Sequence, residues 1–225
     1  MGFVSGALVP VNAFIGALFL LSTILLMAFR QVEGYMRYFI WQSVLLVLST
    51  ADLAVIRGSP NLFIVAVITL AAKVIMIPLL LRRVLHDELR TRREVELVIN
   101  TQASLLVALL LSVMAYILVI PVLPFAPSGA AVNLPVGLDV LLIGMYTLAI
   151  RREAVPQMLA LMAIDNGVFY AGVSITDSPA IIELAAGLEG VMVVVVVTIL
   201  ARTIAQHIGS TAVGHMATLK EGESR

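Results

Sequence analysis

Three ionisable residues lie in the middle of long apolar stretches, where groups that bind protons are uncommon. Lys73 is in "VITLAAKVIMIPLLL", Asp165 is in "LALMAIDNGVFYAG" and Glu189 is in "ELAAGLEGVMVVVV". Desolvation generally raises the pKa of a carboxyl group and lowers the pKa of an amine, so both can exchange protons near neutral pH. One lysine and two carboxylates could therefore pass protons across an apolar barrier.

Depth within the membrane is what makes these residues candidates. An ionisable side chain in a bilayer costs roughly 2.5–3.5 kcal/mol on insertion scales, so it usually faces protein or trapped water. Each of the three lies within about 5 Å of one plane, at the 1.5 Å rise per residue of a helix. Structural alternatives stay open: an ion pair or helix–helix hydrogen bond for Asp165 and Glu189, and an extended side chain reaching the interface for Lys73.

Three further acidic residues lie closer to the outer ends of apolar stretches: Asp52, Asp139 and Glu183. Water reaches side chains at a membrane interface, so simple interfacial placement is the favoured interpretation of Asp52 and Asp139. Glu183, six residues before Glu189, is retained as a fourth candidate for proton translocation beside Lys73, Asp165 and Glu189.

The elements that must hold these residues are predicted to be transmembrane helices. Of 225 residues, 61% are hydrophobic and 12% are charged, which would leave a globular protein with too much apolar surface. The apolar residues come in blocks of about twenty, the length of a membrane-spanning helix. The sequence therefore predicts an all-α, polytopic bundle of seven spans, at roughly 7–29, 36–56, 61–81, 98–120, 133–150, 157–175 and 180–203.

Basic residues predict the orientation of these spans. Twelve of the fourteen Lys and Arg residues fall in alternate loops and in the C-terminal tail, five of them in "RRVLHDELRTRREVE". The opposite loops hold only Arg57, and Lys73 lies within a span. By the positive-inside rule, we expect the N-terminus outside and the C-terminus in the cytoplasm.

The uncharged segment "PVLPFAPSGAAVNLP" is predicted to be an external linker. It divides the chain into a four-helix part, 1–125, and a three-helix part with a short cytoplasmic tail, 126–225. No loop is long enough to hold a soluble domain.

Composition also argues against several classes of site. The chain has no cysteine, which excludes disulfides, thiolate metal sites and iron–sulfur clusters held by this chain. Its three histidines are scattered and give no ligand spacing, so no metal site is predicted. The net charge is zero, and nothing suggests nucleic acid. The N-terminal "MGFVSGALVP" lacks the basic region of a cleaved signal peptide, so the first block is expected to stay in the mature protein.

The last third of the chain carries a specific pattern. It runs from "RREAVPQMLALMAIDNGVFYAG" through "SPAIIELAAGLEGVMVVVVVTI" to "IGSTAVGHMATLKEG". In it the pair Arg151 and Arg152 precedes Asp165–Asn166–Gly167 and the aromatic Phe169. Further along the chain come Pro179, Glu183 and, six positions after Glu183, Glu189. This pattern, together with "AAKVIMIPLLLRRVL", resembles the hydrogenase-4 component E family of membrane subunits.

The last three spans are also similar to chain K of NADH:quinone oxidoreductase, in which two membrane glutamates carry protons. Glu189 matches the second of these glutamates, and Asp165 lies about one helical turn from the first.

The resemblance implies a non-catalytic subunit of a redox-driven, complex I-like hydrogenase assembly in the prokaryotic cytoplasmic membrane. It implies antiporter-like and chain-H-like membrane partners and a cytoplasmic hydrogenase-like arm. The NiFe centre and iron–sulfur clusters would lie in those partners, with no cofactor in this chain. Whether H⁺ or Na⁺ moves, and whether this chain conducts ions or only couples and seals, stays open.

Two other classes of function remain as alternatives. A stand-alone seven-helix transporter or receptor would more often show repeats and broken helices around a central site, and retinal proteins need a lysine in the last span, where this chain has none. A membrane enzyme would need a cluster of nucleophiles or metal ligands at one surface, and the sequence offers none.

Overall fold

The computed structural model describes residues 2–84, 99–125 and 133–175, and the regular elements in these ranges are helices. They are α1 (Gly2–Ala28), α2 (Val32–Arg57), α3 (Pro60–Thr69), η1 (Leu70–Met76), α4 (Ile77–Val84), α6 (Thr101–Val119), η2 (Leu123–Phe125), α7 (Asn133–Ile150) and α8 (Ala154–Ile175). The predicted all-α class is therefore confirmed for the described part of the chain.

Five stretches of helix are long and apolar enough to cross a membrane: Leu8–Ala28, Val32–Arg57, Pro60–Arg83, Thr101–Val119 and Asn133–Ile150. They correspond to the first five predicted spans. The sixth predicted span corresponds to α8, which has 22 residues but is not among these five. The seventh, 180–203, lies outside the described residues, so the count of seven stays a prediction.

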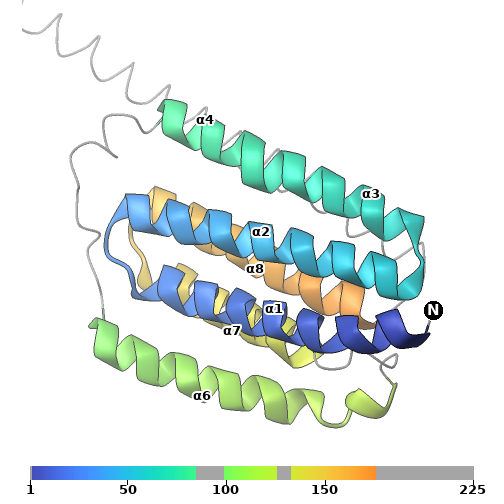
Figure 1. Cartoon of the computed structure of the whole chain (residues 1–225). Helices are drawn as coiled ribbons and strands as arrows, with labels where there is room; N and C mark the ends of the chain where they lie inside the picture. Colours follow the sequence, from blue (N-terminus) through green and yellow to red (C-terminus); the bar gives the residue numbers. More distant parts are fainter. Residues whose placement is uncertain (1, 85–98, 126–132, 176–225) are drawn as a thin grey trace, which may run out of the picture.

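Four helices form the core of the bundle. Figure 1 shows α1 beside α2 and α7 beside α8, and the two pairs pack against each other through α1 with α7 and α2 with α8. The helix made of α3, η1 and α4 lies along one flank, against α2, and α6 lies along the opposite flank, against α7 and α1. The core thus combines helices from both predicted parts of the chain.

Small residues bring α7 and α8 close together. A Cβ atom added at Gly137 would lie 2.5 Å from the backbone nitrogen of Ala171, and one at Gly167 would lie 2.6 Å from that of Leu141. Only glycine fits such backbone contacts, which are typical of helix pairs in membranes. This packing leaves little room for α8 to shift along α7, and so fixes the depth of the residues that α8 carries.

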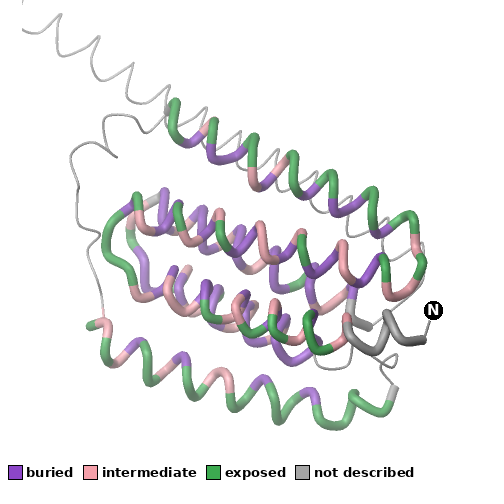
Figure 2. The backbone as a smooth tube through the Cα atoms, in the orientation of Figure 1, coloured by how far each residue is buried: buried purple, intermediate pink, exposed green. Residues whose placement is uncertain are grey.

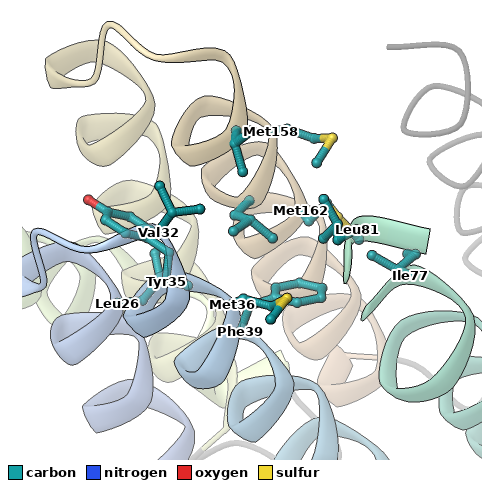
Figure 3. Close-up of a cluster of buried hydrophobic side chains, with 11 residues drawn as sticks. Leu26, Val32, Tyr35, Met36, Phe39, Ile77, Leu81, Met158 and Met162 are labelled. Atoms are coloured by element: carbon teal, nitrogen blue, oxygen red, sulfur yellow. The ribbon is translucent and has the colours of Figure 1, made fainter. Parts of the chain in front are cut away.

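Residues on the helix faces toward the centre of the bundle are buried, whereas α6 and α3–α4 are exposed along most of their outward faces (Figure 2). One apolar cluster ties one end of the bundle together from α1, α2, α4 and α8, through residues that include Leu26, Phe39, Ile77 and Met162 (Figure 3). Helices α1, α2 and α8 also supply the polar site described below, together with η1, the segment that directly precedes α4.

A stretch of π-helix interrupts the third long helix. In η1 the amide of Ile77 donates to the carbonyl of Ala72, five residues back. Proline has no amide hydrogen and its ring clashes with the carbonyl four residues before it, so Pro78 prevents regular α-helix from continuing through Val74. π-helical turns often lie at functional sites, and this one contains Lys73.

Candidate functional site

Lys73 and Asp165 form a buried ion pair at the centre of the site. The ammonium nitrogen of Lys73 lies 2.6 Å from Oδ2 of Asp165, and the two residues are 1% and 8% exposed. Lys73 therefore does not extend to the interface. The structure brings together two of the four residues that the sequence predicted as proton-translocating, one from η1 and the other from α8.

Asn166 holds the same ammonium group from a second side. Lys73 Nζ donates to Oδ1 of Asn166 over 2.7 Å, and Asn166 is fully buried. Consecutive residues on a helix point in directions about 100° apart, so Asp165 and Asn166 can both face Lys73 only from either side of it. The pair that opens "DNG" in the sequence is therefore one binding unit for the lysine.

The hydrogen bonds continue from Asn166 across two more helices. Nδ2 of Asn166 donates to Oε1 of Gln42 over 3.1 Å, and Nε2 of Gln42 donates to the hydroxyl of Thr23 over 2.6 Å. That hydroxyl donates to the carbonyl of Phe19 over 3.1 Å. Helices η1, α8, α2 and α1 are thus joined by one chain of polar groups, called the central network below.

Gln42 and Thr23 were not predicted from the sequence as part of the site. Both are neutral and lie in long apolar helices, and a threonine there usually bonds to its own backbone, as Thr23 does to the carbonyl of Phe19. Gln42 is fully buried and has no charge to draw attention to it. A signal was present: a glutamine in mid-span must find a partner, because an unpaired amide in an apolar setting is costly.

A second group of polar side chains lies nearer to one end of the bundle, the end at which α1 and α7 begin. The amide nitrogen of Asn12 donates to Oδ2 of Asp52 and to the carbonyl of Ser49, each over 3.0 Å. Asn133 donates to Oδ1 of Asn12, and the hydroxyl of Ser49 donates to that of Tyr170 over 3.3 Å. Asp52 is only partly buried, and its interfacial placement stays a prediction.

Apolar side chains separate this group from the central network. The ring of Phe19 stacks on Tyr170 with centroids 4.7 Å apart, and Phe19 and Leu46 are fully buried. Along α8, Tyr170 is four residues from Asn166, a rise of about 6 Å. The two polar groups are therefore about one helical turn apart along the bundle, and about one layer of apolar side chains lies between them.

At the opposite end of the bundle, the two arginines that follow α7 differ from each other. Arg151 is 2% exposed, and Arg152 is exposed. Arg151 donates to the carbonyl of Met27, and to that of Phe29 over 3.3 Å, and its guanidinium lies 5.0 Å from the ring centroid of Tyr35. Burial lowers the pKa of Arg151, but an arginine stays protonated, so it supplies a fixed positive charge at the C-terminal end of α1.

The interfacial placement expected for Asp139 is wrong. Asp139 is 0% exposed and lies inside the bundle on α7, with neither carboxyl oxygen in a hydrogen bond within the described residues. The sequence pattern located it near a helix end, but the start of α7 packs against its neighbours and is itself buried. Glu183 and Glu189 lie outside the described residues, so their predicted roles stay predictions.

No cluster of three or more His, Asp or Glu side chains within the described ranges could hold a metal ion. The groups that are brought together are one ammonium, one carboxylate, two amides and a hydroxyl. Such a set can bind, orient and exchange protons with the lysine and the aspartate, and it offers no nucleophile beside a base.

Comparison with known proteins finds a relative of matching length. The chain is 27% identical over 206 residues to the uncharacterized protein Rv0085 of Mycobacterium tuberculosis, covering 89% of this chain and 92% of that protein. No protein-family model matches the chain, and no solved structure matches it.

Proposed function

We propose that this chain is a proton-translocating membrane subunit in which Lys73 and Asp165 form the central proton-exchanging pair. The observation that carries the proposal is the burial of this ion pair, with a 2.6 Å contact, between α8 and a helix that is apolar enough to span a membrane. A buried ion pair adds little net stability compared with apolar packing of the same volume. A role in ion movement gives such a pair a reason to be present.

The pair can couple two protonation events. A proton that binds Asp165 neutralises the carboxylate and removes the negative charge that Asp165 places beside Lys73. The ammonium group keeps its hydrogen bond to the Asn166 carbonyl oxygen but loses the favourable charge of Asp165, so it releases a proton to the next acceptor more readily. The proton on Asp165 then passes to the neutral amine of Lys73 across the 2.6 Å contact, which restores the ion pair and leaves one proton moved from the Asp165 side to the acceptor beyond Lys73. Net transfer therefore needs no movement of the helix backbone.

The setting of this subunit is proposed from the resemblance to the hydrogenase-4 component E family and to chain K. In this proposal the chain lies in a prokaryotic cytoplasmic membrane, with its N-terminus outside and its C-terminus in the cytoplasm. It adjoins antiporter-like and chain-H-like subunits, and a cytoplasmic hydrogenase-like arm holds the NiFe centre and the iron–sulfur clusters. Glu183 and Glu189 would extend the path from the central network. A stand-alone seven-helix transporter or receptor is the alternative.

The test must separate pairing from proton transfer, because removing one partner of a buried ion pair leaves the other uncompensated. Lys73→Met and Asp165→Asn should each weaken assembly, and the double variant should restore it by removing both charges. Proton uptake per assembled complex in sealed vesicles should fall in all three variants, including the restored one. Normal proton uptake in an assembled double variant would leave this pair with a structural role only.

Assembly itself separates the subunit from the stand-alone alternative. Extraction of native membranes in mild detergent should bring down several larger membrane subunits with this chain. A long-lived monomer that binds its own ligand would contradict the proposal.

A further inference from the structure

Asp139 lies on the other side of the core from the Lys73–Asp165 pair. It belongs to α7, and the side chains that interact with it, Ser112 and Tyr116, are on α6. Helix α6 and the helix that carries Lys73 lie on opposite flanks of the bundle (Figure 1). Asp139 therefore belongs to a separate polar position, which the central network does not include.

Among the described residues, the carboxyl group of Asp139 has no cationic partner, and the hydroxyl of Ser112 is the hydrogen-bond donor beside it. Neither Oδ1 nor Oδ2 accepts a hydrogen bond within the described residues, although the residue is 0% exposed. Ser112 is close, but its hydroxyl has a single hydrogen, and this hydrogen is donated to the carbonyl of Ala108 over 3.0 Å. Asp165 differs in this respect, because Lys73 supplies both a charge and a donor.

An ionised carboxylate in this position would be a buried charge without a counter-ion among the described residues, which is a costly arrangement in a protein. A protonated carboxyl carries no charge and gains an O–H donor, for which the lone pairs of the Ser112 hydroxyl are available. We propose that Asp139 binds a proton in the resting protein, and is a second proton-binding site at the interface of α6 and α7.

The packing of α6 makes this site a point where proton binding and helix position are linked. Helix α6 faces the core mainly through small residues, Ser104, Ala108, Ser112 and Ala115, and most of its outer face is exposed. Loss of the proton would leave a negative charge on α7, covered only by these small side chains of α6. Release of the proton should therefore accompany separation of α6 from α7, with entry of water or of a cation.

Infrared spectroscopy of the full-length chain in lipid tests the site directly, because a protonated carboxylic acid has a carbonyl absorption that a carboxylate lacks. The wild type should show this absorption near neutral pH, Asp139→Asn should lose it, and Asp139→Glu should keep it at a shifted frequency. Asp52→Asn is the matched control and should retain it, since Asp52 is only partly buried and already accepts a hydrogen bond from Asn12. Identical spectra for wild type and Asp139→Asn would overturn the proposal.

Two further measurements keep the test decisive if Asp139→Asn fails to fold. Ser112→Ala removes the acceptor, so the absorption should shift to that of an acid without a hydrogen bond; an unchanged frequency would contradict the placement. Titration with sodium in place of potassium should leave the absorption unchanged, and its loss would show that the site holds a metal cation instead. The outcome does not depend on proton transfer at Lys73, so this site and the proposed function can fail separately.

Discussion

Lys73 and Asp165 are 92 positions apart in the sequence, and their charged atoms are 2.6 Å apart in the structure. The contact joins the outer helix of one flank to the centre of the core. Most of the other contacts of that helix are with α2, so the ion pair and the adjoining bond to Asn166 determine how its η1 segment is set against α8.

The first prediction follows from this geometry and concerns stability. Asp165→Asn should lower the stability of the purified chain by about 3–5 kcal/mol, the usual cost of leaving one member of a buried ion pair without its partner. Lys73→Met should have a similar effect. The double variant should be closer to the wild type than either single variant, because both charges are gone. Thermal unfolding in detergent measures all four proteins; purely additive losses would mean that the two charges are not coupled.

The sequence alone predicted the two residues of this contact but not the contact itself. Hydropathy located each described span, because a helix in lipid must be apolar over a length that the membrane fixes. The intramembrane charges identified Lys73 and Asp165, because such residues are costly and need partners. Which charge pairs with which was not predictable, since it depends on how helices that are distant in sequence rotate against each other.

The same limit explains the residues that were missed or misplaced. Gln42 became part of the central network only because α2 lies beside α8. Asp139 was expected at a wet interface because of its distance from a helix end, but the packing of α6 on α7 closes over it. Hydrophobic patterns predict the position of a residue along its helix, but they say little about which neighbouring helix packs against a given face.

The second prediction concerns the close packing of α7 and α8. Gly137→Ala should be strongly destabilising, because the new methyl group would lie 2.5 Å from the backbone nitrogen of Ala171, which cannot move without shifting a helix. Gly172→Ala is the matched control, since nothing lies within 4 Å of its added Cβ, and alanine favours helix over glycine by about 1 kcal/mol. Comparing the melting temperatures of the two variants checks this. Equal effects would mean that the helices are not held at this distance.

The third prediction distinguishes the two adjacent arginines. Arg151→Gln should lose charge-assisted bonds to carbonyls at the end of α1, each worth about 1.5–3 kcal/mol, together with the contact to Tyr35. Arg151→Lys should recover little, because an ammonium group cannot reproduce the planar, forked geometry of a guanidinium. Arg152→Gln, at an exposed position, should have a small effect. Denaturation in detergent compares the three, and a larger loss in the Arg152 variant would contradict the assignment.

The fourth prediction tests orientation in the membrane. Because the native chain has no cysteine, single engineered cysteines report cleanly on accessibility. A membrane-impermeant thiol reagent applied to intact cells should label Ser128→Cys, in the predicted external linker, and should not label Asp87→Cys, in the Arg-rich loop. Opening the cells should make Asp87→Cys reactive. The reverse pattern would invert the predicted topology.

The last prediction concerns the order of effects along the central network. Asn166→Leu removes an acceptor from Lys73 itself, Gln42→Leu removes the group that orients Asn166, and Thr23→Val removes only the far end. If the network serves to orient the proton-exchanging pair, proton uptake per assembled complex should fall most for Asn166, less for Gln42 and least for Thr23.

A network that acts only to hold helices together gives another pattern. Each buried group left without a partner would then cost about 1–3 kcal/mol of stability, assembly would suffer at all three positions, and proton uptake per assembled complex would stay normal. Measuring both quantities on the same vesicles separates the two roles, because stability depends on every bond in the network, whereas proton exchange depends on the distance of each bond from Lys73.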